Sequence, residues 1–239
     1  MLEIKNFTKV YPNGKVAVKD LSLTVSSGDI FGFIGHNGAG KTTLIRSVVG
    51  VLDFEQGEIT IDGHSVKTDP IRAKEVTAYI PDNPELYDYL TGVQYLNFIG
   101  DMYRVPGPVR VELIQKYAGA LELTGDLGGL ISSYSHGMKQ KLALISALIH
   151  SPRLMVLDEP FVGLDPKAVH TLKEIMKELC RQGSAIFFSS HVLDVVEKLC
   201  NKIAIIKNGV LVACGETDRV RGDVSLEDVF LELIDNEQV

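Results

Sequence analysis

Apolar residues follow two different periods along the chain, and the period predicts the type of each element. Short alternating or continuously apolar runs predict strands, and apolar residues that return every three or four positions predict helices. Strands before residue 63 predict an antiparallel sheet, and the alternation of strands and helices in the second half predicts a mainly parallel one. The predicted strands span residues 2–10, 21–25, 29–34, 57–63, 154–157, 185–190, 202–206 and 210–212. The predicted helices span residues 43–49, 137–150, 166–183 and 192–200.

The stretch from about residue 84 to 133 has a different pattern. Thr91 and Gln94 have the spacing of a capping box, and apolar residues between 109 and 121 follow helical spacing, without a strong strand pattern. We therefore expect a single α/β domain over residues 1–239 with a helical subdomain inserted at about 84–133. Six of the 9 Phe and 8 Tyr residues fall between Tyr79 and Tyr103. This density suits a docking surface for a partner and the core of the subdomain about equally.

Composition narrows the possible functions. Hydrophobic residues make up 45% of the 239 residues, which is enough for a sizeable core, and the net charge is −7. An acidic chain argues against a nucleic-acid partner, which usually requires a basic face. No signal peptide opens the chain, and no apolar run reaches the roughly 18–20 residues that span a bilayer. We expect a cytoplasmic protein that reaches a membrane only through a partner.

The three cysteines, Cys180, Cys200 and Cys214, lack metal-ligand spacing and are expected to be small buried residues.

Residues 35–42 read Gly-His-Asn-Gly-Ala-Gly-Lys-Thr and separate a predicted strand from a predicted helix. Strand, glycine-rich loop and helix form the context of a phosphate-binding loop. Glycines let successive N–H groups point at one anion, and the start of the helix adds its unpaired N–H groups. Lys41 adds a positive charge beside the phosphates, and the Thr42 hydroxyl is a ligand for Mg²⁺. The expected nucleotide contacts are Gly35, His36, Asn37, Gly38, Ala39, Gly40, Lys41, Thr42 and Thr43.

Two adjacent carboxylates follow the apolar run 154–157. Asp158 ends a predicted buried strand, where α/β sheets place ligand groups, and its oxygens suit Mg²⁺. Glu159 points in a different direction and is placed to orient and deprotonate a water that attacks a phosphate. We therefore expect Lys41, Asp158 and Glu159 to act together in transferring a phosphoryl group of a bound nucleotide to water.

The segment 134–140, Tyr-Ser-His-Gly-Met-Lys-Gln, resembles the Leu-Ser-Gly-Gly-Gln signature of ATP-binding cassette (ABC) ATPases. In that family, this segment contacts the γ-phosphate bound by the other subunit, so that ATP lies between two cassettes. Ser135 is placed to cap the helix that follows, and Ser135 and Gly137 match the residues that approach the phosphate. Tyr134, His136 and Met138 depart from the signature, which affects the expected tightness of dimer closure.

The resemblance implies further roles. Asp165, in the segment Gly-Leu-Asp-Pro, matches the loop that crosses the dimer interface, with capping of the next helix as its other reading. His191 matches the histidine that touches the γ-phosphate, and together with Glu159 and Lys41 it completes the expected catalytic set. Tyr11 matches the aromatic residue that stacks on adenine, although surface packing is also open.

Asp82 occupies a position where the family usually has glutamine. A carboxylate binds Mg²⁺ at least as well as an amide oxygen, but it places extra negative charge near the γ-phosphate. We expect Asp82 to contact the metal or a water, alongside Thr42 and Asp158 as metal ligands. The alternative is that Asp82 faces solvent, because the surrounding residues are typical of turns.

The resemblance implies the ATP-binding and ATP-hydrolysing subunit of an ABC transporter, and we expect a bacterial exporter of unidentified cargo. ATP and Mg²⁺ are the expected ligands. The expected partners are a second copy or a paralogue of the cassette and transmembrane permease subunits on a separate chain, at the inner face of the cell membrane. Two other functions stay open: a soluble ABC ATPase, for example in metal-cluster assembly, and a regulatory module that holds ATP without turnover.

Overall fold

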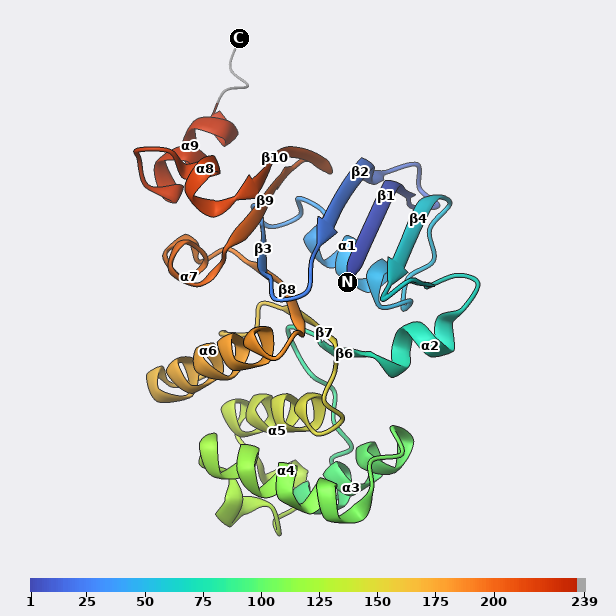
Figure 1. Ribbon diagram of the computed structural model, residues 1–239, viewed down its shortest axis with the longest axis vertical. Coiled ribbons are helices and arrows are strands. Elements are labelled where there is room, and N and C mark those ends of the chain that lie inside the picture. The colour runs from blue at the N-terminus through green and yellow to red at the C-terminus, as the bar shows by residue number, and fades with distance from the viewer. Residues whose placement is uncertain (236–239) are drawn as a thin grey trace.

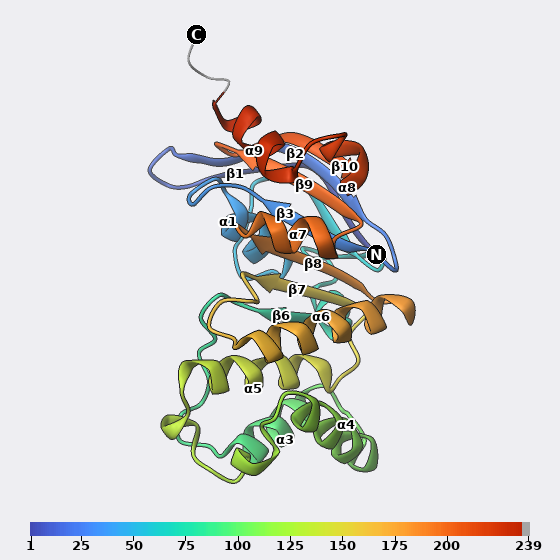
Figure 2. The same ribbon diagram turned by 90° about the vertical axis from the view of Figure 1, so that its left-hand side faces the viewer.

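The computed structural model describes residues 1–235, which form two sheets with helices around them (Figures 1 and 2). The smaller sheet is antiparallel, as predicted, and its strands lie in the order β2-β1-β4-β5. Its members are β1 (Leu2–Val10), β2 (Val16–Val25), β4 (Gln56–Ile61) and β5 (His64–Ser65). β2 begins earlier than predicted because Val16 already pairs with Val10 of β1 across a tight hairpin.

The larger sheet has the strand order β10-β9-β3-β8-β7-β6 and is parallel except for β10. The register pairs Asp158 with Ser189, so the carboxyl ends of neighbouring strands meet at one edge. The Asn208–Gly209 turn joins its antiparallel pair, and Asn-Gly between two apolar runs is a sequence signal for such a hairpin. Its members are β3 (Ile30–Ile34), β6 (Thr77–Ile80), β7 (Leu154–Asp158), β8 (Ala185–Ser190), β9 (Lys202–Lys207) and β10 (Val210–Glu216).

The two faces of the larger sheet bury different helices. Successive side chains of a strand point to opposite faces. In β8, Phe187 therefore joins the core that contains Leu44 of α1 (Lys41–Val48), whereas Phe188 joins the core that contains Leu144 of α5 (His136–Leu148). The second core also holds α6 (Pro166–Arg181) and α7 (Leu193–Leu199). α1 and α5 thus lie on opposite faces of the sheet.

The stretch from 84 to 133 is helical, with α3 (Gly92–Met102) and α4 (Gly107–Ala120) packed against α5. The capping box is present: Gln94 N–H donates to Thr91 Oγ1 at 3.3 Å, and Thr91 N–H donates to Gln94 Oε1 at 2.9 Å. That residues 84–133 form a separate subdomain stays a prediction.

Some elements were not predicted. The strand β6 and the helix α2 (Pro70–Glu75) are short, and each is defined by its neighbours rather than by its own pattern. The described part of the chain ends with α8 (Thr217–Arg221) and α9 (Leu226–Asp235). Cys180 and Cys200 are buried as expected, but Cys214 is exposed. That prediction was wrong because β10 is an edge strand whose residues are mostly accessible.

Candidate nucleotide site

The loop between β3 and α1 has the backbone that phosphate binding requires. Gly38 and Gly40 have φ values of +82° and +113°, which L-residues with side chains rarely adopt. A Cβ at Gly40 would lie 2.6 Å from the carbonyl oxygen of Ala17, whereas a Cβ at Gly38 would meet no atom within 4 Å. Gly40 therefore allows the loop to pack closely on β2, and Gly38 leaves its open side free for a ligand.

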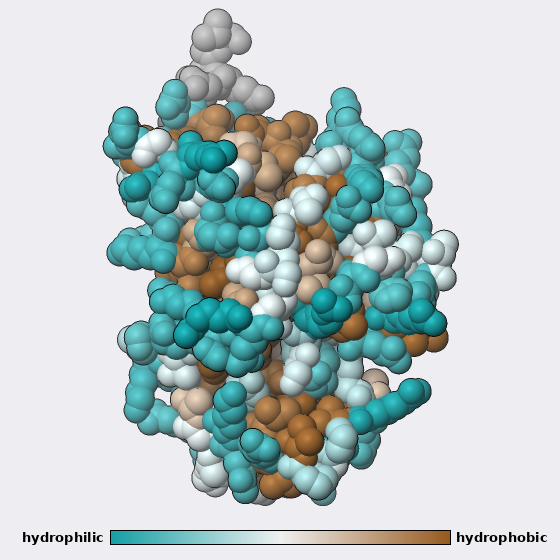
Figure 3. Space-filling model, in the orientation of Figure 1, coloured by the Kyte–Doolittle hydropathy of each residue, from teal (hydrophilic) through white to brown (hydrophobic). Residues whose placement is uncertain are grey.

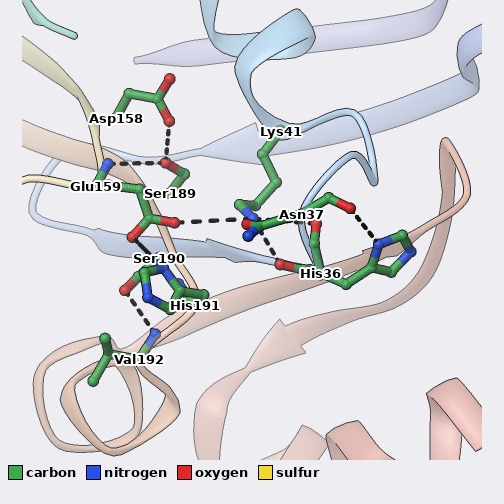
Figure 4. A network of polar contacts seen from close by, with 10 residues as sticks. His36, Asn37, Lys41, Asp158, Glu159, Ser189, Ser190, His191 and Val192 are labelled. Atoms are coloured by element: carbon green, nitrogen blue, oxygen red, sulfur yellow. Dashed lines mark hydrogen bonds and ion pairs between the residues drawn. The ribbon is translucent and has the colours of Figure 1, made fainter. Parts of the chain in front are cut away.

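Lys41 begins α1 and is 7% exposed. Its Nζ donates to the carbonyl oxygens of Gly35 at 2.7 Å and His36 at 3.3 Å (Figure 4). Glu159 Oε1 lies 3.9 Å from the same nitrogen. Burial lowers the pKa of Lys41, and the carboxylates of Glu159 and Asp158 oppose that shift. Polyphosphate would add negative charge that stabilises the ammonium form further.

A serine of the neighbouring strand fixes the two carboxylates at the end of β7. Ser189 Oγ donates to Asp158 Oδ1 at 2.5 Å and accepts from the N–H of Glu159 at 3.1 Å (Figure 4). Asp158 is 3% exposed, and Glu159 has a φ of +49°. A non-glycine residue in this region is strained, and such strain persists where the surroundings hold it. The turn points Asp158 and Glu159 in different directions, as the sequence predicted.

His191 lies directly beside Glu159. The distance from His191 Nδ1 to Glu159 Oε2 is 3.0 Å, and the backbone N–H of His191 donates to the same oxygen at 3.4 Å (Figure 4). The imidazole is 54% exposed, whereas the Glu159 side chain is 14% exposed. Glu159 thus lies between Lys41 and His191, and the three form one polar network.

A cavity of about 540 Å³ opens above the loop. Its size suits a nucleotide. Tyr11 lies at its wall and shares a hydrogen bond of 3.1 Å with the Thr43 hydroxyl. Gly35 and Ala39 belong to the loop without lining the cavity, and His191 reaches it through Glu159. The lining residues are Tyr11, Lys15, Val16, Ala17, His36, Asn37, Gly38, Gly40, Lys41, Thr42, Thr43, Asp82, Asp158, Glu159 and Asn208.

The donor set in this cavity fits a hydrated Mg²⁺ ion. Thr42, Asp82 and Asp158 offer hydroxyl and carboxylate oxygens, which are the ligands that Mg²⁺ prefers. Asp82 follows β6 and is exposed at the wall of the cavity. Asp82 is thus both exposed to solvent and placed at the wall of the cavity. Its contact with a metal stays a prediction.

Three predicted nucleotide contacts, Ser135, Gly137 and Asp165, do not line this cavity. Ser135 is exposed and caps α5, since its Oγ accepts from the N–H of Met138 at 3.3 Å. Asp165 caps α6 by accepting from the N–H of Ala168 at 2.8 Å. That hydrogen bond, together with Lys141, lowers the pKa of Asp165. Both residues belong to the helices that cover the opposite face of the sheet from α1.

Three polar residues of the site were not predicted. Ser189 holds both carboxylates, and a hydroxyl at the end of a predicted strand was a usable signal for it. Lys15 and Asn208 line the cavity through tertiary contacts. The hairpin that carries Asn208 is held against the loop because Gly209 N–H donates to the carbonyl of Ala39 at 2.9 Å.

Fold and site together define a phosphate-loop nucleotide-binding protein, and comparison with known proteins identifies the family. Residues 18–162 match the family model described as "ABC transporter". The linearmycin resistance ATP-binding protein LnrL of Bacillus subtilis (strain 168) is 34% identical over 234 residues, covering 95% of this chain and 74% of LnrL. A solved structure of the ATP-binding subunit of an ABC transporter has a TM-score of 0.94 and 32% identity, covering 98% of this chain and 99% of that one. The chain therefore belongs to the ABC transporter family.

This membership confirms the resemblance inferred from residues 134–140, the fold class and the ATPase activity. The protein is the ATP-binding subunit of an ABC transporter and hydrolyses ATP to power transport. A dimeric post-hydrolysis structure of the ATP-binding cassette MJ0796 with ADP and Pi shares the fold, with a TM-score of 0.82 at 22% identity over 91% of this chain and 99% of that one. No helix within residues 1–235 is long and apolar enough to cross a bilayer.

Proposed function

We propose that two copies of this chain close on two ATP molecules and thereby drive a bacterial exporter. Each ATP lies between the loop 35–42 of one copy and the Ser135 helix start of the other. The observation that carries this proposal is that α1, which follows the loop, and α5, which follows Ser135, lie on opposite faces of one sheet. A single copy cannot bring both features to one phosphate, whereas two copies in an antiparallel arrangement can.

The polar network around Glu159 supports hydrolysis in this arrangement. Glu159 accepts a proton from the attacking water, and the 3.0 Å contact with His191 orients its carboxylate. Lys41 and the loop N–H groups stabilise negative charge on the phosphates. Thr42, Asp158 and Asp82 would hold Mg²⁺, which neutralises phosphate charge when it is bound. Tyr11 offers its ring to the adenine at the other end of the cavity.

An exposed aromatic cluster supports docking of a permease on a separate chain. Tyr87 packs against Tyr89, with ring centroids 5.9 Å apart, and against Phe98 at 5.6 Å. Tyr89 is 75% exposed and Met102 on α3 is 63% exposed. Figure 3 shows a hydrophobic area over α3 and α4. Aromatic residues and Met are enriched at interface cores. Such docking would hold the protein at the inner face of the membrane.

The direction of transport rests on similarity to relatives. LnrL is named for resistance to linearmycin, and resistance conferred by an ABC transporter indicates export of the compound. We therefore assign this chain to the exporters among ABC transporters.

Mixing two inactive variants tests the shared site. Lys41→Ala disables the loop, and Ser135→Arg blocks the helix start of α5. In a mixed dimer with one mutation on each chain, one site combines both damaged parts and the other combines both intact parts. Random mixing should therefore restore about a quarter of the wild-type sites, measured as ATPase activity. The inactive control is a chain that carries both Lys41→Ala and Ser135→Arg, because no dimer of this chain has an intact site. If the separate variants stay inactive when mixed, the shared site is refuted.

A further inference from the structure

The start of α5 touches the loop between β7 and α6 through His136. The imidazole lies against Gly163: a Cβ at Gly163 would be 2.7 Å from His136 Nε2 and in even closer contact with Cδ2. Gly163 has a φ of +79°, and a Cβ at Gly137 would lie 2.9 Å from its carbonyl oxygen. The imidazole therefore occupies the space that any side chain at Gly163 would need.

A second contact joins the same two segments. Lys141 Nζ lies 2.9 Å from Asp165 Oδ2, and the Lys141 side chain is 15% exposed. Asp165 also caps α6 through the N–H of Ala168. The loop is thus held by α5 near Gly163 and again at Asp165, its last residue before α6.

The loop that α5 holds in this way begins with Glu159. Val162 N–H donates to the carbonyl of Glu159 at 3.2 Å, one residue before Gly163. Phe161 packs edge-on against Phe188 of β8, with ring centroids 5.7 Å apart. Because the connection is short and Glu159 already has a strained φ of +49°, we expect a shift at Gly163 to change the direction of the Glu159 carboxylate.

We infer that His136 is a positioning residue for ATP hydrolysis, acting through Gly163 on Glu159. The packed imidazole keeps the loop where Glu159 faces Lys41 and the phosphate end of the cavity. Ser135, at the same helix start, is the residue that we place at the partner's nucleotide. His136 therefore links engagement of one ATP to the alignment of the carboxylate that acts on the other. This inference rests on the proposed role of Glu159 and on the proposed dimer.

Truncation of the imidazole tests the inference in the full chain. We expect His136→Ala to lower kcat about tenfold, because misplacement of a catalytic group costs rate. Binding of ATP to the monomer and the thermal midpoint should stay unchanged, since His136 is exposed and does not line the cavity of its own chain. His136→Gln keeps a flat polar side chain and should retain most of kcat. His170→Ala, which removes another exposed imidazole from α6, is the matched control and should leave kcat unchanged.

A double-mutant cycle locates the effect. A methyl group at Gly163 displaces the imidazole, so Gly163→Ala should also lower kcat. If His136 acts through Gly163, the two losses should not multiply in the double variant. Losses that multiply would overturn the inference, as would a His136→Ala variant with wild-type kcat while Glu159→Gln is inactive. Wild-type turnover in Glu159→Gln would instead refute the proposed role of Glu159.

Discussion

We place two helix starts at phosphate in this protein, and they differ in what surrounds them. At α1, Lys41 is buried beside two loop carbonyls and two carboxylates. At α5, Ser135 is exposed, and Lys139 and Lys141 in the first turns are each paired with a carboxylate, at 2.7 and 2.9 Å. The first site carries its own cation and cavity, whereas the second offers N–H groups and a hydroxyl with its positive charges already compensated.

This difference explains why the chain should bind ATP alone but hydrolyse it only as a pair. A buried, preorganised site provides most of the binding free energy for the triphosphate. An exposed helix start adds a smaller interaction that forms only when another copy brings a phosphate to it. Hydrolysis can then depend on closure, and closure is the event that a membrane partner can use.

The largest expected effect comes from a substitution that stops hydrolysis at the first site, around Lys41, but preserves ATP binding there. Glu159→Gln removes the base but keeps the size of the side chain and its place beside Lys41. Turnover should fall by about 10²–10⁴-fold, the range for loss of a general base, while ATP binding persists. ATPase rates and size-exclusion chromatography with ATP measure both properties, and a trapped dimer should appear. Wild-type turnover would remove Glu159 from the mechanism.

Acid should lower the stability of the folded protein because of His150, which lies on the same side of the molecule as α5. This residue follows α5 and stacks on Tyr103, with ring centroids 3.7 Å apart. Burial lowers the pKa of His150 from 6.5 to about 4. Between these values the unfolded chain binds a proton that the folded chain does not, so stability falls as pH falls. The expected loss is about 3 kcal/mol across the window.

The control for this prediction is His150→Phe, which keeps an aromatic ring against Tyr103 but does not titrate. Urea unfolding from pH 7 to pH 4 should give a shallower loss of stability for the variant than for the wild type. Parallel curves would show that His150 does not contribute to acid sensitivity.

A smaller effect should follow from weakening the second site alone. Ser135→Ala removes the hydroxyl but leaves the cavity around Lys41 intact. Turnover should fall about tenfold, corresponding to one hydrogen bond to a charged group. Binding of a fluorescent ATP analogue to the monomer should be unchanged. Weaker monomer binding would mean that Ser135 contributes to the site of its own chain.

The smallest expected effect concerns the metal at the first site. Asp82→Gln replaces the carboxylate at the cavity wall by an uncharged amide on a side chain one carbon longer. Activity should depend less steeply on Mg²⁺, with a shift of a few-fold in the concentration that gives half-maximal rate. A titration of ATPase activity with Mg²⁺ measures this. An identical titration curve would show that Asp82 does not contact the metal.

Local signals were strong enough to predict much of this molecule. The phosphate loop, the capping box at Thr91 and the Asn208–Gly209 turn each depend on a few adjacent residues with specific backbone preferences. The buried strands of the larger sheet were predicted because strands covered on both faces are continuously apolar. The strand β6, by contrast, is a strand because β7 pairs with it, and so the exact placement of Asp82 could not be read from its neighbours in sequence.

The sequence by itself therefore determined the chemistry: the cation, the carboxylates, the helix caps and the family that combines them. Only the tertiary structure decided their relations. It placed Ser189 between Asp158 and Glu159, brought Asn208 to the cavity, set His136 against Gly163 and put Ser135 on the face opposite α1. The physical reason is the distance along the chain over which each kind of interaction acts. Backbone preference and charge act within a few residues, whereas the direction of a side chain toward a distant partner depends on how sheet and helices pack.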